Sequence, residues 1–153
     1  MWKELNVDHN VSLIFPFHTF DPIGDGNVTL AMEYNVTVRD PSGKNITAFY
    51  PNENKTEGRV LDPFHPNFYQ YVKKQTGGAV AGLWLLKNEP WIEGIKDFEG
   101  DTGRYNDLVF TPGGHKLSDR TLPMDTRHWP YTDNSAHYNL HSLYGLEMTW
   151  KVI

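Results

Sequence analysis

Lys87, Asn88 and Glu89 end an apolar run of strand length, and their types and spacing point to a site at this corner. The run covers residues 81–86, and Pro90 closes the corner. A buried parallel strand has this pattern when its last side chains project into a site. Glu89 is the only carboxylate at this tip, so acid–base chemistry here would depend on it or on a carboxylate from another segment.

A second apolar run, Val11–Phe17, is rich in β-forming residues and leads to Asp21 and Pro22. We read it as a buried strand with Asp21 in the loop that follows. An Asp-Pro pair also begins ordinary turns, so Asp21 alone does not identify a site. Together with the corner 24–26 it resembles part of a calcium loop, but Met32 stands where that loop needs its last carboxylate. We expect no metal and no cofactor.

Length and composition limit the classes of protein that this chain can represent. Its 153 residues suffice for one domain with a core, whereas a complete (β/α)8 barrel typically needs about 250. The net charge of -5 comes from interspersed charges, which favours neither nucleic acid nor a membrane surface as partner. No apolar run reaches the roughly 20 residues of a membrane span. The first residues lack the order of a signal peptide, so we expect the natural N-terminus to lie upstream.

Five Asn-X-Ser/Thr triplets crowd into the first third of the chain, and there is no cysteine. Such triplets are acceptors for N-linked glycans, although Asn-rich loops also produce them by accident. We predict a secreted protein, or one in the lumen of the secretory pathway. Asn10 opens an apolar strand and should be buried, which leaves four glycosylation candidates: Asn27, Asn35, Asn45 and Asn54.

The middle of the chain predicts a hairpin, then a helix and a strand. In residues 34–51, apolar side chains alternate with polar ones on both sides of a turn at 41–44. Pro66 suits the first position of a helix that Gly77 and Gly78 stop, with an apolar stripe of Phe68, Tyr71 and Val72. The strand 79–86 follows at once, which is the helix-then-strand order of an α/β barrel.

From Pro90 to Asn134 the apolar residues follow no sustained helix or strand period, which predicts a long loop. Barrel enzymes place such loops over the active site. His137 and His141 follow, four residues apart on an expected helix, a spacing that zinc sites also use. No glutamate follows His137 as a metalloprotease would require, so we expect these histidines to be hydrogen-bonded at the start of the helix.

The corner 84–90, Trp-Leu-Leu-Lys-Asn-Glu-Pro, resembles the nucleophile strand of family 31 glycoside hydrolases, the α-glucosidases and α-xylosidases, which reads Trp-(Ile/Leu)-Asp-Met-Asn-Glu-Pro. In that frame Leu86 holds the place of the nucleophilic aspartate. An alkyl side chain can neither attack an anomeric carbon nor stabilise an oxocarbenium ion, so a retaining mechanism built on two carboxylates loses one of them. The resemblance therefore implies no catalytic residue at this position.

Further blocks extend the resemblance over most of the chain and in the order of the family: 49–51, 60–67, 105–106, 112–113, 120–125 and 137–146. Through them it implies six residues around a sugar pocket: Asp21, Tyr50, Trp84, Lys87, Asn88 and Glu89. Tyr50 replaces a pocket tryptophan and can still stack on a sugar. Lys87 replaces a methionine and either forms a salt bridge to Asp21 or Glu89 or reaches into solvent. In the family the glutamate is structural or orients substrate.

These observations lead to one expectation for the fold and two for the function. We expect an α/β fold in which residues 1–153 are a fragment of a single glycosidase-like (β/α)8 catalytic domain, about the third to fifth βα units with an insertion hairpin. The remaining parts of the barrel or adjacent chains would complete it. The first function is a catalytically inactive domain of a secreted glycoprotein, with a structural or carbohydrate-binding role in an extracellular assembly. The alternative is a fragment of an active retaining α-glucosidase that hydrolyses α-linked glucosides.

Overall fold

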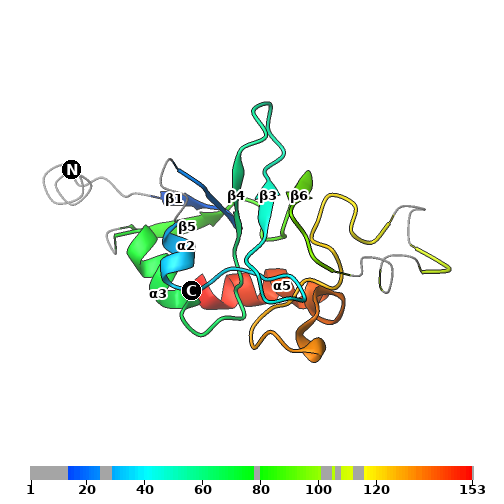
Figure 1. Ribbon diagram of the computed structural model, residues 1–153. Coiled ribbons are helices and arrows are strands. Elements are labelled where there is room, and N and C mark those ends of the chain that lie inside the picture. The colour runs from blue at the N-terminus through cyan, green and yellow to red at the C-terminus, as the bar shows by residue number, and fades with distance from the viewer. Residues whose placement is uncertain are drawn as a thin grey trace, which may run out of the picture.

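The computed structural model describes residues 14–24, 29–77, 80–100, 105, 108–111 and 116–152, which form a mixture of strands and helices (Figure 1). In chain order the elements are β1 (Ile14–Phe17), β2 (Phe20–Pro22), α2 (Leu30–Glu33), β3 (Thr47–Phe49), β4 (Glu57–Val60), α3 (Phe68–Gln75), β5 (Gly82–Leu85), β6 (Gly94–Lys96), the 3-10 helix η2 (Asp133–Ser135) and α5 (His137–Val152).

β1 and β5 form a two-stranded parallel sheet in which Ile14 pairs with Gly82 and Phe17 with Leu85. The N–H of Leu86 donates to the carbonyl of Phe17 at 3.0 Å, so the pairing continues one residue past β5. The predicted parallel orientation is therefore observed. The predicted burial is wrong, because Ile14 is 67% and Trp84 62% exposed. One face of this sheet packs on the core, and among the described residues no layer covers the other.

The second sheet is antiparallel, in the order β2-β4-β3-β6. The predicted turn is present, because Asp40 Oδ1 accepts hydrogen bonds from the Ser42 hydroxyl and the Lys44 N–H. The predicted hairpin over 34–51 is confirmed only next to this turn, where Arg39 and Asn45 form an antiparallel bridge. β3 pairs with β4 and β6, and the Val38 N–H donates to the carbonyl of Val60 instead of to the returning arm.

β6 comes from the long segment in which the sequence shows no period, so that segment is not wholly irregular. Ile95 of β6 lies opposite Ala48 of β3 and packs against the core beneath the second sheet. In Figure 1 the β3–β4 hairpin projects away from α5, which runs along the opposite side of the molecule. The segment thus adds the outer strand of the second sheet before it reaches α5.

α3 has the predicted apolar stripe, and all three of its members are buried. The helix begins two residues later than expected, at Phe68, with Asn67 at the N-cap and Pro66 before it. α5 begins at His137 as predicted and contributes Tyr144 and Met148 to the same core. The buried members of this core, from β1, α2, α3, α5 and the loops between them, are Phe17, Ala31, Val36, Leu61, Phe68, Tyr71, Val72, Tyr144 and Met148.

Gly58 lies where β4 passes against β2, and a side chain has no room there. A Cβ atom built on it would overlap the ring of Phe20 and lie 2.6 Å from the carbonyl oxygen of Asp21. We expect Gly58→Ala to lower the free energy of unfolding by about 1–3 kcal/mol, the usual cost of overpacking. Urea denaturation measures the loss. Gly24→Ala is the control, because nothing lies within 4 Å of its added Cβ and its stability should hardly change.

The longest described helix, α5, has 16 residues. Across the described ranges no helix combines the length and the apolar character that a membrane crossing requires.

Candidate functional site

The loops that follow β1 and β5 are joined by hydrogen bonds to main-chain carbonyls. The carbonyl of Glu89 accepts from the Thr19 hydroxyl at 2.9 Å and from the N–H of Trp91, also at 2.9 Å. The carbonyl of Pro90 accepts from the Thr121 hydroxyl at 3.0 Å. Because the two strands are parallel, their carboxyl ends meet at one edge, and these bonds fix the loops there.

Four rings gather at this edge, and we call them the aromatic cluster: His18, Phe20, Tyr50 and Trp91. Tyr50 lies at the centre, with ring centroids 6.0 Å from His18, 5.3 Å from Phe20 and 5.9 Å from Trp91. Its contacts with His18 and Trp91 are edge-to-face, at 87° and 79°. The cluster joins residues from both strand ends and from the β3–β4 hairpin, so the fold of both sheets determines its geometry.

Two clefts border the aromatic cluster. The first, of about 340 Å³, runs between β1, α3 and the β3–β4 hairpin and is lined by His18, Phe20, Tyr50 and Tyr71 among others. The second, of about 570 Å³, is more polar; its lining consists of Pro51, Asn52, Glu53, Lys55, Trp91, Ile92, Glu93 and Arg120. An apolar surface of rings beside carboxylate and amide groups has the composition that a sugar ring requires, with a flat face and hydroxyls at its rim.

Leu86 is half-buried, and its strand pairing gives it the same sheet face as Trp84. Lys87 follows with a positive φ of 61°. Its ammonium lies 3.1 Å from the centroid of the Trp91 ring, a cation–π contact. The predicted salt bridge to Asp21 or Glu89 is not among the ion pairs of the described residues, whereas Lys87 is exposed, as the alternative prediction has it, with its ammonium on an aromatic face.

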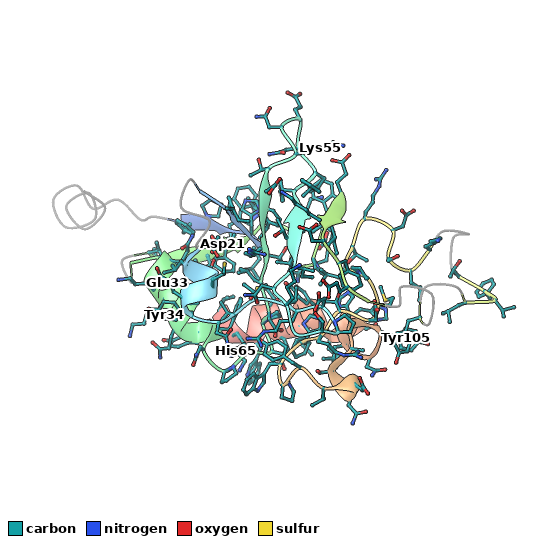
Figure 2. All side chains as sticks on the ribbon, viewed as in Figure 1. Asp21, Glu33, Tyr34, Lys55, His65 and Tyr105 are labelled. Carbon is teal, nitrogen blue, oxygen red and sulfur yellow. The ribbon has the colours of Figure 1, made fainter. Side chains whose placement is uncertain are left out.

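Asp21 does not face the aromatic cluster as a free carboxylate. It is buried on β2, and its Oδ2 accepts the N–H of Ala31 at 2.8 Å, within the first turn of α2. Figure 2 shows Asp21 beside α2, whereas Lys55 lies at the far tip of the β3–β4 hairpin. A carboxylate held by a helix N–H stabilises the helix start. Asp21 therefore has a structural partner.

The other predicted pocket residues lie apart from one another. Glu89 is exposed, and its main-chain carbonyl provides the contacts described above. Asn88 is exposed and lies against α5, where a Cβ on Gly145 would be 3.1 Å from its Nδ2. Trp84 lines neither cleft. Of the six predicted residues, Tyr50 lies in the aromatic cluster and Lys87 contacts it.

Sequence reasoning missed a buried chain of polar side chains, Asp62–His128–His137, which we call the buried relay. Asp62 Oδ1 lies 2.9 Å from His128 Nδ1, and His128 Nε2 lies 2.9 Å from His137 Nδ1. The Trp129 N–H donates to Asp62 Oδ2 at 2.7 Å. All three side chains are at most 1% exposed. No local spacing could reveal it, because Asp62 and His128 are 66 positions apart.

The buried relay lacks what a catalytic triad needs. Burial, with the neighbouring His128 second, holds the pKa of His137 well below its ordinary value, which keeps this imidazole neutral. Burial likewise raises the pKa of Tyr144, and its hydroxyl donates to the carbonyl of Leu61 at 2.7 Å. The neighbouring Ser135 donates its hydroxyl to the main-chain carbonyl of His128 at 2.7 Å and not to an imidazole, and neither cleft reaches the relay. We assign it to stability.

His137 and His141 do share a helix face, with ring centroids 6.1 Å apart. His137 Nδ1 is bonded within the buried relay, as expected for a histidine at the start of the helix. The described ranges contain no group of three histidine, cysteine or acidic side chains placed to hold a metal ion.

The glycosylation candidates differ in exposure. Asn54, at the tip of the β3–β4 hairpin, and Asn35 are exposed. Asn45 is half-buried, and its Oδ1 accepts from the Thr37 hydroxyl at 2.8 Å. Asn10 and Asn27 lie outside the described residues, as does the rest of the calcium-like corner at 25–26.

Comparison with known proteins identifies no family for this chain, so a proposal for its function rests on the geometry described above. No protein-family model matches the sequence, and no curated protein matches it.

Proposed function

We propose that this chain is a glycosidase-like domain, part of a (β/α)8 barrel, that binds carbohydrate without hydrolysing it. The observation that carries the proposal is the aromatic cluster at the carboxyl ends of two parallel strands, beside a half-buried Leu86. In α/β folds, sites form at the carboxyl ends of the strands.

The carboxylates near the strand ends support binding without chemistry. A retaining glycosidase needs two carboxyl groups about 5–5.5 Å apart, one of them a nucleophile. Asp21 is bonded to the N–H of Ala31, Glu89 is exposed, and Leu86 carries no charge. None of the three offers the activated carboxylate that attack on an anomeric carbon requires.

The rings support a sugar as the ligand. Tyr50 has neighbours on three sides, so its orientation is fixed before a ligand arrives, and Trp91 carries the Lys87 ammonium on one face. A preorganised aromatic surface loses little entropy on binding. The second cleft adds Asn52, Glu53 and Glu93, which can accept hydrogen bonds from sugar hydroxyls.

Titration of maltose against tryptophan fluorescence tests the binding. We expect saturable quenching from Trp91, and we expect Tyr50→Ala to weaken the affinity about tenfold, which corresponds to the loss of one aromatic contact. Tyr69→Ala is the matched control, since Tyr69 is 50% exposed on α3 and lines neither cleft. Equal affinities for the two variants would rule out the aromatic cluster as the site.

An assay with an α-linked aryl glucoside tests the absence of chemistry. We expect no turnover above the uncatalysed rate. Turnover that depends on a carboxylate of this chain would favour the alternative, an active retaining α-glucosidase. The two measurements are independent, so binding without turnover supports the proposal as a whole.

The proposal places the protein in the secretory pathway. Expression through that pathway should add N-glycans at the exposed Asn54 and Asn35, with lower occupancy at the half-buried Asn45. We expect Asn54→Gln to remove one glycan from the mass released by glycosidase treatment. Asn52→Gln is the control, because Asn52 begins no acceptor triplet. Glycan-free protein from secreting cells would contradict this placement.

The proposal also includes completion of the parallel sheet from outside residues 1–153. Two parallel strands with one uncovered face are unusual by themselves, since parallel sheets are normally covered on both sides. Further strands from the same polypeptide or from adjacent chains would supply what is missing, as an extracellular assembly requires.

A further inference from the structure

The tip of the β3–β4 hairpin forms one wall of the second cleft. The lining from the tip includes Asn52, Glu53 and Lys55, and the lining from the segment before β6 includes Trp91 and Glu93. The Lys55 ammonium lies 3.6 Å from the Glu93 carboxylate, so an ion pair joins the two segments. The tip is therefore held beside the cleft by a contact between residues that line it.

Hydrogen bonds within the tip fix its conformation. The N–H of Lys55 donates to the carbonyl of Asn52 at 3.0 Å, which closes a tight turn over residues 52–55. The Asn52 side chain then bridges this turn to Thr56: its Oδ1 accepts the Thr56 N–H at 3.0 Å, and its Nδ2 donates to the Thr56 hydroxyl at 2.9 Å. Asn54 lies within this turn and is exposed, so its side-chain amide faces solvent from a fixed backbone.

Asn54 begins the acceptor triplet Asn54-Lys55-Thr56. Its neighbours on both sides, Glu53 and Lys55, line the second cleft, and consecutive Cα atoms are about 3.8 Å apart. An N-glycan on Asn54 therefore starts at the rim of this cleft. The other exposed candidate, Asn35, differs, because neither it nor its neighbours line either cleft.

We propose that the first sugars of the N-glycan on Asn54 occupy the second cleft and mask it from other carbohydrates. The inference rests on the proposed function and adds a means of regulating the same site. An N-glycan begins with N-acetylglucosamine, whose ring can pack on Trp91 and whose hydroxyls can donate to Glu53 and Glu93. The cleft volume of about 570 Å³ lies within the range of small-ligand pockets, about 300–1,000 Å³.

Attachment to the same chain makes this competition effective. A short flexible tether gives the attached sugar a local concentration of about 1 mM. With a dissociation constant of about 0.1–1 mM for that sugar, the cleft is occupied for half of the time or more. The affinity for an added sugar then falls by one plus the ratio of the two concentrations, which is about two- to tenfold.

Maltose titration of the chain secreted from cells, followed by tryptophan fluorescence, tests the masking. We expect Asn54→Gln to bind maltose about two- to tenfold more tightly than the glycosylated original chain. Asn35→Gln is the matched control, because it removes a glycan that starts away from both clefts, and it should bind like the original chain. Enzymatic removal of all N-glycans should raise the affinity of the original chain to that of Asn54→Gln, which makes the result independent of any substitution.

The converse effect provides a second measurement, because coupling between two ligands is reciprocal. Maltose in the cleft displaces the attached glycan into solvent. An endoglycosidase should therefore trim the glycan on Asn54 faster when maltose is present, while the rate at Asn35 stays the same. Mass spectrometry of the glycopeptides follows both sites in one sample and shows which of them carry glycan.

Three results would overturn the inference: an Asn54 without glycan in the secreted chain, equal maltose affinities of the glycosylated chain and Asn54→Gln, or trimming at Asn54 that maltose does not change. Each of them leaves the proposed function intact, provided that the glycan-free chain binds maltose. Absence of maltose binding in every form, the glycan-free chain included, would instead refute the proposed function and this inference with it.

Discussion

Replacing Asp62 with alanine is expected to lower the free energy of unfolding by about 3–5 kcal/mol, because several buried donors lose their acceptor at about 1–3 kcal/mol each. Asp62 is fully buried and accepts from the His128 imidazole, the N–H of Trp129 and the N–H of Phe64. Without it, three donors lose their acceptor in an interior where water cannot replace it. Urea denaturation followed by circular dichroism measures the loss.

The control for Asp62→Ala is the removal of a carboxylate that has its partner at the surface. Glu57 lies 3.2 Å from Lys96, and both side chains are about half exposed. Glu57→Ala should cost about 0–1 kcal/mol, as exposed pairs do. Equal losses in the two variants would mean that the buried relay stabilises the fold no more than an exposed ion pair does. A difference of several kcal/mol would show that the relay holds the loops after β4 and before α5 together.

The buried relay also shows why part of this molecule could not be predicted from sequence. The α3 stripe and the start of α5 follow from local spacing, because residues three and four apart share a helix face. The relay joins Asp62, His128 and His137 through tertiary folding alone. Isolated histidines have no period, so their partners become visible only when the loops are placed in space.

The strands show a different limit of prediction from sequence. The apolar runs ending at Phe17 and Leu86 predict parallel strands, and the two do pair in parallel. Hydrophobicity alone cannot say what covers each face, however, and Trp84 is exposed in the chain described here. The hairpin was predicted correctly only beside its turn, for a related reason. Alternation around the turn at 40–44 fits several pairings, and β4 competes successfully for β3.

The candidate site was predicted in part. Tyr50 was identified as a stacking residue, and it forms the centre of the aromatic cluster. His18 and Phe20, which follow the first apolar run, also contact Tyr50, and no motif in the sequence indicates this. Their position just after a predicted strand is the feature of the sequence that could have indicated a place in the site. The structural role of the Asp21 carboxylate could not be predicted from the sequence. Its hydrogen bond to the Ala31 N–H depends on α2, a helix of only four residues.

Acidification is expected to destabilise the fold progressively below about pH 6.5, the ordinary pKa of histidine. The folded state holds the pKa of His137 well below that value, chiefly by burial and then through His128 and His141. The unfolded chain therefore binds more protons than the folded one as the pH falls through this range. The stabilisation is complete above pH 6.5 and is lost below it, with a slope of up to about 1.4 kcal/mol per pH unit for one proton.

Charged and titratable groups around His137 modify this slope. Asp62 lies beyond His128 in the relay, and Tyr144 packs on the His137 ring from α5. His65, close to Asp62, has its pKa lowered by burial and by Arg39, against the opposing effect of Asp62, so it adds to the slope with the same sign. The free energy of unfolding, measured by urea denaturation at half-unit steps between pH 5 and 8, gives the profile.

Two variants identify the group responsible for the slope. His137→Gln should be less stable at pH 8, because it disturbs the bond to His128, and should have a markedly flatter profile below pH 6.5. His141→Gln is the control, since His141 is exposed on the next turn and is the smallest of the three causes that lower the His137 pKa, so this variant should keep a steep profile. A profile that is flat in the original chain, or that flattens equally in both variants, would place the titration elsewhere. A selective loss in His137→Gln would show that the start of α5 is fixed by a neutral imidazole, which acid releases by protonating it.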